Sequence, residues 1–151
     1  NIHRHMDMGK SALQAALGAM PAAAAYLVER TVTDVVAEVL VTVRRDAPIG
    51  WLVTVGHGGV TTELWSDVAH LLAPVTRADV IGALGRLRSA PLLRGFRGRP
   101  PADMDALADL VVRLTDAVVG SDVVEVELNP VLVGQVGATA VDALMIVEVP
   151  S

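Results

Sequence analysis

The chain has 151 residues, 52% of them hydrophobic, and a formal net charge of −5 at pH 7. The absence of cysteine excludes disulfides and cysteine–metal centres, and the acidic balance argues against nucleic acid as a partner. No uninterrupted apolar run approaches the roughly 18 residues that a membrane-spanning helix needs. There is also no secretory signal, so the composition predicts a cytoplasmic domain of ordinary size without membrane contact.

The N-terminal third predicts one helix followed by strands. The stretch "SALQAALGAM" is rich in helix formers and ends at Pro21, which predicts a helix over residues 11–20. "AYLVE" is a short strand candidate, and the β-branched runs at 35–46 and 51–56 predict a hairpin through "APIG". We therefore expect a helical N-terminal segment over residues 1–24 and a domain over residues 25–149.

The remaining elements predict a sheet with helices packed on it. Thr76 and Asp79 have the spacing of a capping box that begins a helix, and Asp103 precedes the longest amphipathic stretch. Short strands are expected in "VTTELW" and "VAHLLAP", a loop over residues 91–101, and two closing strands joined by "GQVG". Because strands mostly follow strands through short turns, the fold class is α+β, with a mainly antiparallel sheet and two to three packed helices.

The first closing strand, "VEVELNPVLV", carries an unusual polar column. Glu125, Glu127 and Asn129 are spaced two apart, so in a strand they point to the same side, opposite an apolar face. Pro130 has no N–H for the ladder, which predicts an edge or a bulge just beyond Asn129.

Counting through the hairpin places a second oxygen donor beside this column. A "GQVG" turn that sets Val133 opposite Ala138 also sets Asn129 opposite Asp142, at a Cβ separation of about 4.5–5.5 Å. With Glu127 next in the column, these oxygens suit a hard cation such as Mg²⁺, which takes a few protein ligands together with phosphate and water. The alternative is a solvated face with a cross-strand Asn–Asp hydrogen bond, and the spacing leaves both readings open.

Three further features have both a functional and a structural reading. Glu38 lies inside an apolar strand, where it either accepts a bond from a bound group or faces solvent. The "GHGG" turn with Gly58 and Gly59 lets the backbone approach an anion closely, and His57 is either a phosphate ligand or base there or simply a turn residue. The arginines of residues 88–99 suit phosphate oxygens or are solvated.

In this order, the pieces resemble a known family. The stretches "LVERTV", "TVGHGGVTTELWSDVAHLLAP", "LLRGFRGRPPADMDALADLV" and "EVELNPVLV", with a later "AVDAL", resemble the ATP-grasp domain of NDP-forming acyl-CoA synthetases. That family includes the ADP-forming acetate–CoA ligases and is related to the succinyl-CoA synthetase β subunit. The resemblance covers about residues 26–146, and its most specific part is Glu-x-Asn-Pro followed by an aspartate on the next strand.

The resemblance implies roles for several residues. Asn129 and Asp142 match Mg²⁺ ligands, accompanied by Glu127. Glu29 matches the adenine-side hinge and Glu38 the carboxylate that contacts the nucleotide. The Gly58–Gly59 turn and Glu63 match a "GG…E" element of the family.

The resemblance also implies a reaction and partners. The family joins an acid to CoA with ATP, giving acyl-CoA, ADP and phosphate through a phosphohistidine on another domain. The cofactors are then Mg²⁺ and ATP or ADP, and the partners are CoA-binding and phosphohistidine domains in the same protein or in another subunit. A homo-oligomer is compatible with this pattern.

The chain departs from the family at its N-terminal side. The family's "His-Lys-Ser-Asp-x-Gly-Gly" segment is at most echoed by "HRHMDMG", and the only lysine is Lys10. We therefore expect this chain alone to be inactive as a ligase. The competing hypothesis is a degenerate or regulatory ATP-grasp module that binds or assembles without catalysis.

Overall fold

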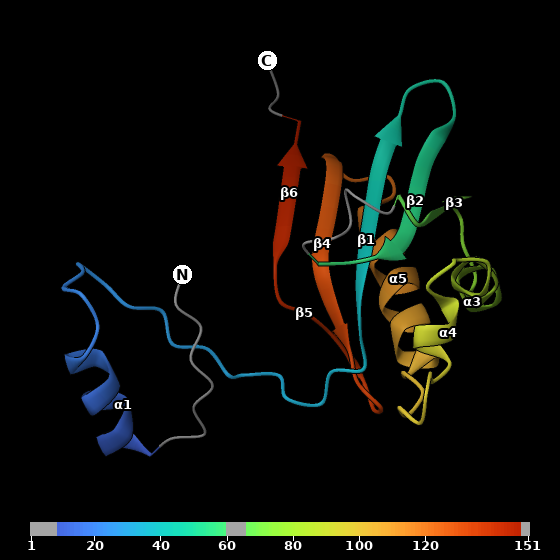
Figure 1. Ribbon diagram of the computed structural model, residues 1–151. Coiled ribbons are helices and arrows are strands. Elements are labelled where there is room, and N and C mark those ends of the chain that lie inside the picture. Colours follow the sequence, from blue (N-terminus) through green and yellow to red (C-terminus); the bar gives the residue numbers. More distant parts are fainter. Residues whose placement is uncertain (1–8, 60–65, 149–151) are drawn as a thin grey trace. The chain divides into compact units, whose positions relative to one another are not determined.

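The computed structural model describes residues 9–59 and 66–148 (Figure 1). Internal contacts divide the chain into two compact units, residues 1–33 and 34–151. The boundary between residues 24 and 25, expected from the sequence, stays a prediction about domain organisation.

The first unit contains one helix and an extended segment. Helix α1 (Lys10–Gly18) confirms the helix predicted before Pro21. The strand predicted at "AYLVE" is wrong, because residues 21–33 contain no strand. Tyr26 donates its hydroxyl to the Pro21 carbonyl at 2.7 Å, while the Leu27 side chain is 83% exposed. High β-propensity therefore produces extended backbone here but no strand, since no partner edge is paired with it.

The second unit is built around one antiparallel sheet, which confirms the α+β prediction. Its order is β3-β2-β1-β4-β5, with β6 also paired to β4. Every pairing is antiparallel. The strands are β1 (Ala37–Asp46), β2 (Gly50–His57), β3 (Val68–Leu72), β4 (Val123–Val133), β5 (Ala138–Ala140) and β6 (Ala143–Val147). The predicted strand "VTTELW" lies outside the described residues.

Alternation along the strands separates a packed face from an open face. On β1, Val39, Val41 and Val43 are at most 2% exposed, and the residues between them point the other way. Helices α3 (Arg77–Gly85), α4 (Ala90–Leu93) and α5 (Met104–Val118) lie on the valine face (Figure 1). No described helix of residues 34–148 covers the opposite face, which carries the polar column of β4.

The helices begin where the sequence predicts, with one addition. Thr76 and Asp79 form a complete capping box on α3, and Asp103 caps α5 by accepting the Ala106 N–H. The loop predicted from residue 91 instead begins with α4, where Pro91 sits in the first turn, a position at which proline needs no amide donor.

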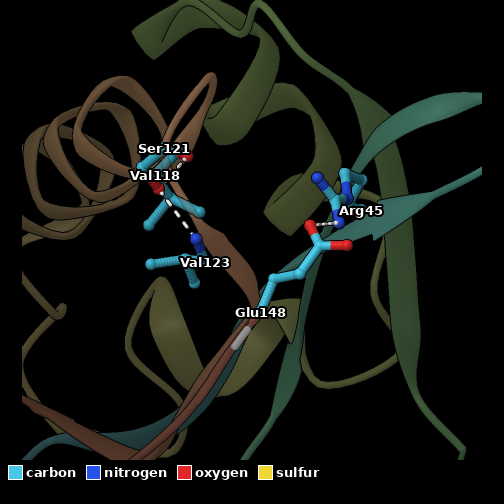
Figure 2. A network of polar contacts seen from close by, with 5 residues as sticks. All are labelled: Arg45, Val118, Ser121, Val123 and Glu148. Atoms are coloured by element: carbon cyan, nitrogen blue, oxygen red, sulfur yellow. Dashed lines mark hydrogen bonds and ion pairs between the residues drawn. The ribbon is translucent and has the colours of Figure 1, made fainter. Parts of the chain in front are cut away.

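Polar contacts hold the end of the sheet far from the "GQVG" turn (Figure 2). The Ser121 hydroxyl donates to the Val118 carbonyl at 2.7 Å and accepts the Val123 N–H at 3.2 Å, joining α5 to β4. Arg45 pairs with Glu148 at 2.5 Å, which ties the end of β1 to the residue after β6. Among the described residues, no helix is long and apolar enough to cross a membrane.

Candidate functional site

The register of the closing strands places Asn129 and Asp142 opposite each other. Val133 pairs with Ala138, as the hairpin count predicts. Beyond the break between β5 and β6 the same register continues, with Leu128 opposite Ala143. Asn129 and Asp142 occupy the interval between these ladders, where the Val141 N–H donates to the Pro130 carbonyl at 3.2 Å.

A bulge interrupts β4 at this point, as the proline predicts. The pairing with β1 shifts register between Val39 and Val41, because two residues of β4 between Leu128 and Val131 lie opposite one residue of β1. Asn129 and Pro130 are therefore the bulged residues. A bulge re-aims a side chain, and here Asn129 turns toward the segment that follows β2.

The Asn129 side chain reaches the glycine turn. Its Oδ1 accepts the Gly59 N–H at 3.2 Å, and the Gly58 N–H donates to the Glu38 carbonyl at 2.9 Å. A Cβ on Gly58 would meet the Val39 backbone at 2.6 Å, and one on Gly59 would overlap the Glu38 carboxylate. The two glycines thus serve close packing of three chain segments, since both amides already have acceptors within the protein.

The structure brings together most, though not all, of the residues singled out in the sequence. Glu38 is exposed, as its solvent-facing reading expected, yet its carboxylate lies against Gly59. Glu127 is half-buried on the open face, opposite Thr42 on β1 and Leu144 on β6. Glu29 is exposed and belongs to the first unit, and Glu63 lies outside the described residues.

The arginines near α4 form a separate feature. Within the described ranges, the recorded ion pairs involve Arg44, Arg45 and Arg77, and none involves an arginine of residues 86–99. Arg97 lies over the Phe96 ring at 5.3 Å. A phosphate-binding role for this cluster stays a prediction.

Asp67 is a structural anchor that the sequence did not reveal. It is 6% exposed, and its carboxylate accepts the N–H groups of Arg88 and Ser89, each at 2.8 Å. Its carbonyl accepts the His57 N–H at 3.0 Å. Burial raises the pKa of the Asp67 carboxyl, but hydrogen bonds from the Ser89 side chain and from both amides together hold it below the ordinary value of 3.8. Asp67 thereby joins the end of β2, at His57, to the residues just before α4.

The donor set on the open face fits a hard cation that also has other ligands. Asp142 is exposed, and its Oδ1 accepts the Ala143 N–H at 2.9 Å, which leaves lone pairs for another partner. In the part of the chain that the structure describes, no three His, Asp or Glu side chains gather closely enough to hold a metal by themselves. A cation held here by Asn129 and Asp142 would need further oxygens from a bound molecule and water, the arrangement that Mg²⁺ prefers.

Comparison with known proteins identifies the family. The family model described as "ATP-grasp domain" matches residues 10–147. Acetate–CoA ligase [ADP-forming] I of Archaeoglobus fulgidus is 37% identical over 110 residues, 72% of this chain and 16% of that protein. The β subunit of acetate–CoA ligase [ADP-forming] I of Pyrococcus furiosus is 36% identical over 110 residues, 72% of this chain and 47% of that subunit.

A solved structure of a related enzyme supports the same family. The dinucleotide-forming acetyl-coenzyme A synthetase 1 of Ca. Korarchaeum cryptofilum matches with a TM-score of 0.71 and 34% identity, over 74% of this chain and 53% of that one. That structure is a complex with coenzyme A and Mg-AMPPCP, its phosphohistidine segment pointing towards the nucleotide-binding site. This chain thus spans about half, or less, of the relatives that it matches. On the family match and these likenesses together, the chain belongs to the ATP-grasp domain family.

Proposed function

We propose that this chain is the Mg²⁺- and nucleotide-binding part of an ADP-forming acyl-CoA ligase. The observation that carries the proposal is the opposed pair of Asn129 and Asp142 on the open face, tied through Gly59 to the segment that holds Glu38. These oxygen donors lie on a sheet face that no described helix of residues 34–148 covers, so the face is accessible to a nucleotide and its metal in this proposal.

In this proposal, each residue of the site binds or orients. Asn129 and Asp142 hold the cation, and Glu127 supplies negative charge next in the column. A bound Mg²⁺ would neutralise charge that develops on a transferring phosphoryl group. Glu38 and the Gly58–Gly59 turn contact the nucleotide beside the metal. A role for Glu29 at the base stays a prediction from the family resemblance. Asn129 is held in place by the Gly59 amide, which reduces the reorganisation needed on binding.

The complete reaction requires parts beyond this chain. Relatives are larger ligases or subunits of them, and one solved relative binds coenzyme A. We infer that CoA-binding and phosphohistidine domains, in the same protein or in a partner subunit, complete the conversion of acid, CoA and ATP to acyl-CoA, ADP and phosphate. A cytoplasmic location and a homo-oligomer remain predictions.

Titration calorimetry with Mg–ADP tests the proposal on the chain as it stands. We expect Asn129→Ala and Asp142→Ala to weaken binding about tenfold or more, the effect of losing about 1.4 kcal/mol. Glu125→Gln is the matched control, because Glu125 lies in the same column without a predicted ligand role. Equal affinity in all variants would refute the metal assignment. A wild-type chain without Mg²⁺-dependent binding would favour the module that assembles without catalysis.

A further inference from the structure

Asp103 makes two contacts that lie in different parts of the fold. Its Oδ1 accepts the Ala106 N–H at 2.9 Å, which caps α5. Its Oδ2 accepts the Gly137 N–H at 2.9 Å, and its own N–H donates to the Gly134 carbonyl at 2.8 Å. The start of α5 is thereby bonded to both ends of the "GQVG" turn. Capping α5 needs only the first of these three bonds.

The turn that Asp103 holds sets the alignment of the proposed metal ligands. The Gly134 N–H donates to the Gly137 carbonyl at 3.0 Å, and the ladder between β4 and β5 begins at the next pair. β5 has only three residues, so few ladder bonds fix the register before Asp142 is reached. A slip of one residue would turn Asp142 to the opposite face of the sheet.

We infer that Asp103 is a positioning residue for the proposed metal site: by clamping the Gly134–Gly137 turn to α5, it fixes Asp142 opposite Asn129. This inference rests on the proposed function for the role of those two residues. Asp103 itself lies on the α5 side of the turn and touches neither of them.

The charge state of Asp103 agrees with this geometry. The Gly137 N–H, and after it the Ala106 N–H, hold the pKa of Asp103 below its ordinary value of 3.8. The clamp therefore uses an ionised carboxylate with an oxygen for each amide. Asparagine has one side-chain oxygen, and its NH₂ group donates and cannot accept the second N–H.

Asp103→Asn separates the two contacts. Asparagine is as good an N-cap as aspartate, so the variant keeps the cap and loses the acceptor for Gly137. We expect Mg–ADP affinity to fall about tenfold, as is typical when a residue that orients a metal ligand is lost, and amide exchange at Gly137 to accelerate. The matched control is Thr76→Ala, which removes the capping box of α3 away from the turn. It should lower the melting temperature and leave the affinity unchanged.

Each outcome supports or overturns the inference. Wild-type affinity in Asp103→Asn overturns it, and so does an equal loss of affinity in Thr76→Ala. If the wild-type chain does not bind Mg–ADP, the proposed function fails, and cross-strand NMR contacts between β4 and β6 decide about the clamp. Loss of the Leu128–Ala143 contact in Asp103→Asn then supports it, and an unchanged contact overturns it.

Discussion

The two faces of this sheet come from alternate residues of the same strands, yet they serve different ends. The helix-covered face is almost wholly valine, closed by α3 and α5, and holds the fold together. The open face carries Glu38, Thr42, Glu127 and Asn129, which are sequence neighbours of the buried residues on the same strands. Since neighbouring residues in a strand share a backbone but not an environment, stability and ligand binding can be changed separately. Four experiments test how complete that separation is.

The largest expected effect comes from the packed face. Leu107 on α5 is fully buried, and Leu107→Ala should lower the free energy of unfolding by about 2–5 kcal/mol, because it removes apolar contacts and leaves a cavity. The control is Leu144→Ala on β6, whose side chain is 59% exposed. It should change stability by less than about 0.5 kcal/mol. Urea denaturation followed by circular dichroism measures both, and equal losses would contradict the assignment of the core.

Asp67 should give the next largest effect, and one that depends on pH. Asp67→Asn removes one of the two carboxylate oxygens that accept the Arg88 and Ser89 amides, which costs about 1–3 kcal/mol at pH 7. The folded-state pKa of Asp67 is lowered, so its contribution to stability is complete above the unfolded-state pKa of about 3.9. It is lost as the pH falls through the folded-state value.

Unfolding experiments at pH 7 and at decreasing pH measure this effect. The difference in stability between wild type and Asp67→Asn should narrow below about pH 4. Asp116→Asn, at an exposed carboxylate on α5, provides the control and should show little difference at either end. A difference in stability between the two proteins that does not change with pH would show that Asp67 acts through packing and not through its charge.

The sequence could predict features set by local structure, but not contacts between distant parts of the chain. The opposition of Asn129 and Asp142 was predictable because register in a hairpin is set by its turn, a local feature. The contacts of Asp67 with Ser89 and of Asp103 with Gly137 join residues 22 and 34 positions apart. No periodicity encodes such contacts, since they depend on how helices dock onto the sheet. "AYLVE" failed for a related reason, because propensity cannot supply a partner strand.

Substitutions at two glycines test the role of the open face in ligand binding, with a smaller expected loss of stability than at Leu107 or Asp67. Gly59 and Gly98 have nearly the same φ, +80° and +81°, so alanine should cost about 1–2 kcal/mol at either. A Cβ at Gly98 meets nothing within 4 Å, whereas one at Gly59 must displace the Glu38 carboxylate. We expect similar melting temperatures for the two variants, with Mg–ADP affinity reduced only in Gly59→Ala. Equal affinities would remove Glu38 and Gly59 from the proposed site.

The smallest effect is expected at an exposed ion pair that belongs neither to the core nor to the proposed site. Arg45 and Glu148 pair at the end of the sheet, with side chains 41% and 61% exposed (Figure 2). An exposed pair of this kind contributes about 0.2–1 kcal/mol and is screened by salt. A double-mutant cycle with Arg45→Ala and Glu148→Ala should therefore give a coupling energy in that range, falling as salt is raised. The Glu148 N–H donates to the Asp122 carbonyl at 2.8 Å, a backbone bond that neither substitution removes, so we expect the backbone after β6 to stay held. A large, salt-independent coupling would mean that this end of the sheet also sets the position of β6, and Asp103 would then share that role.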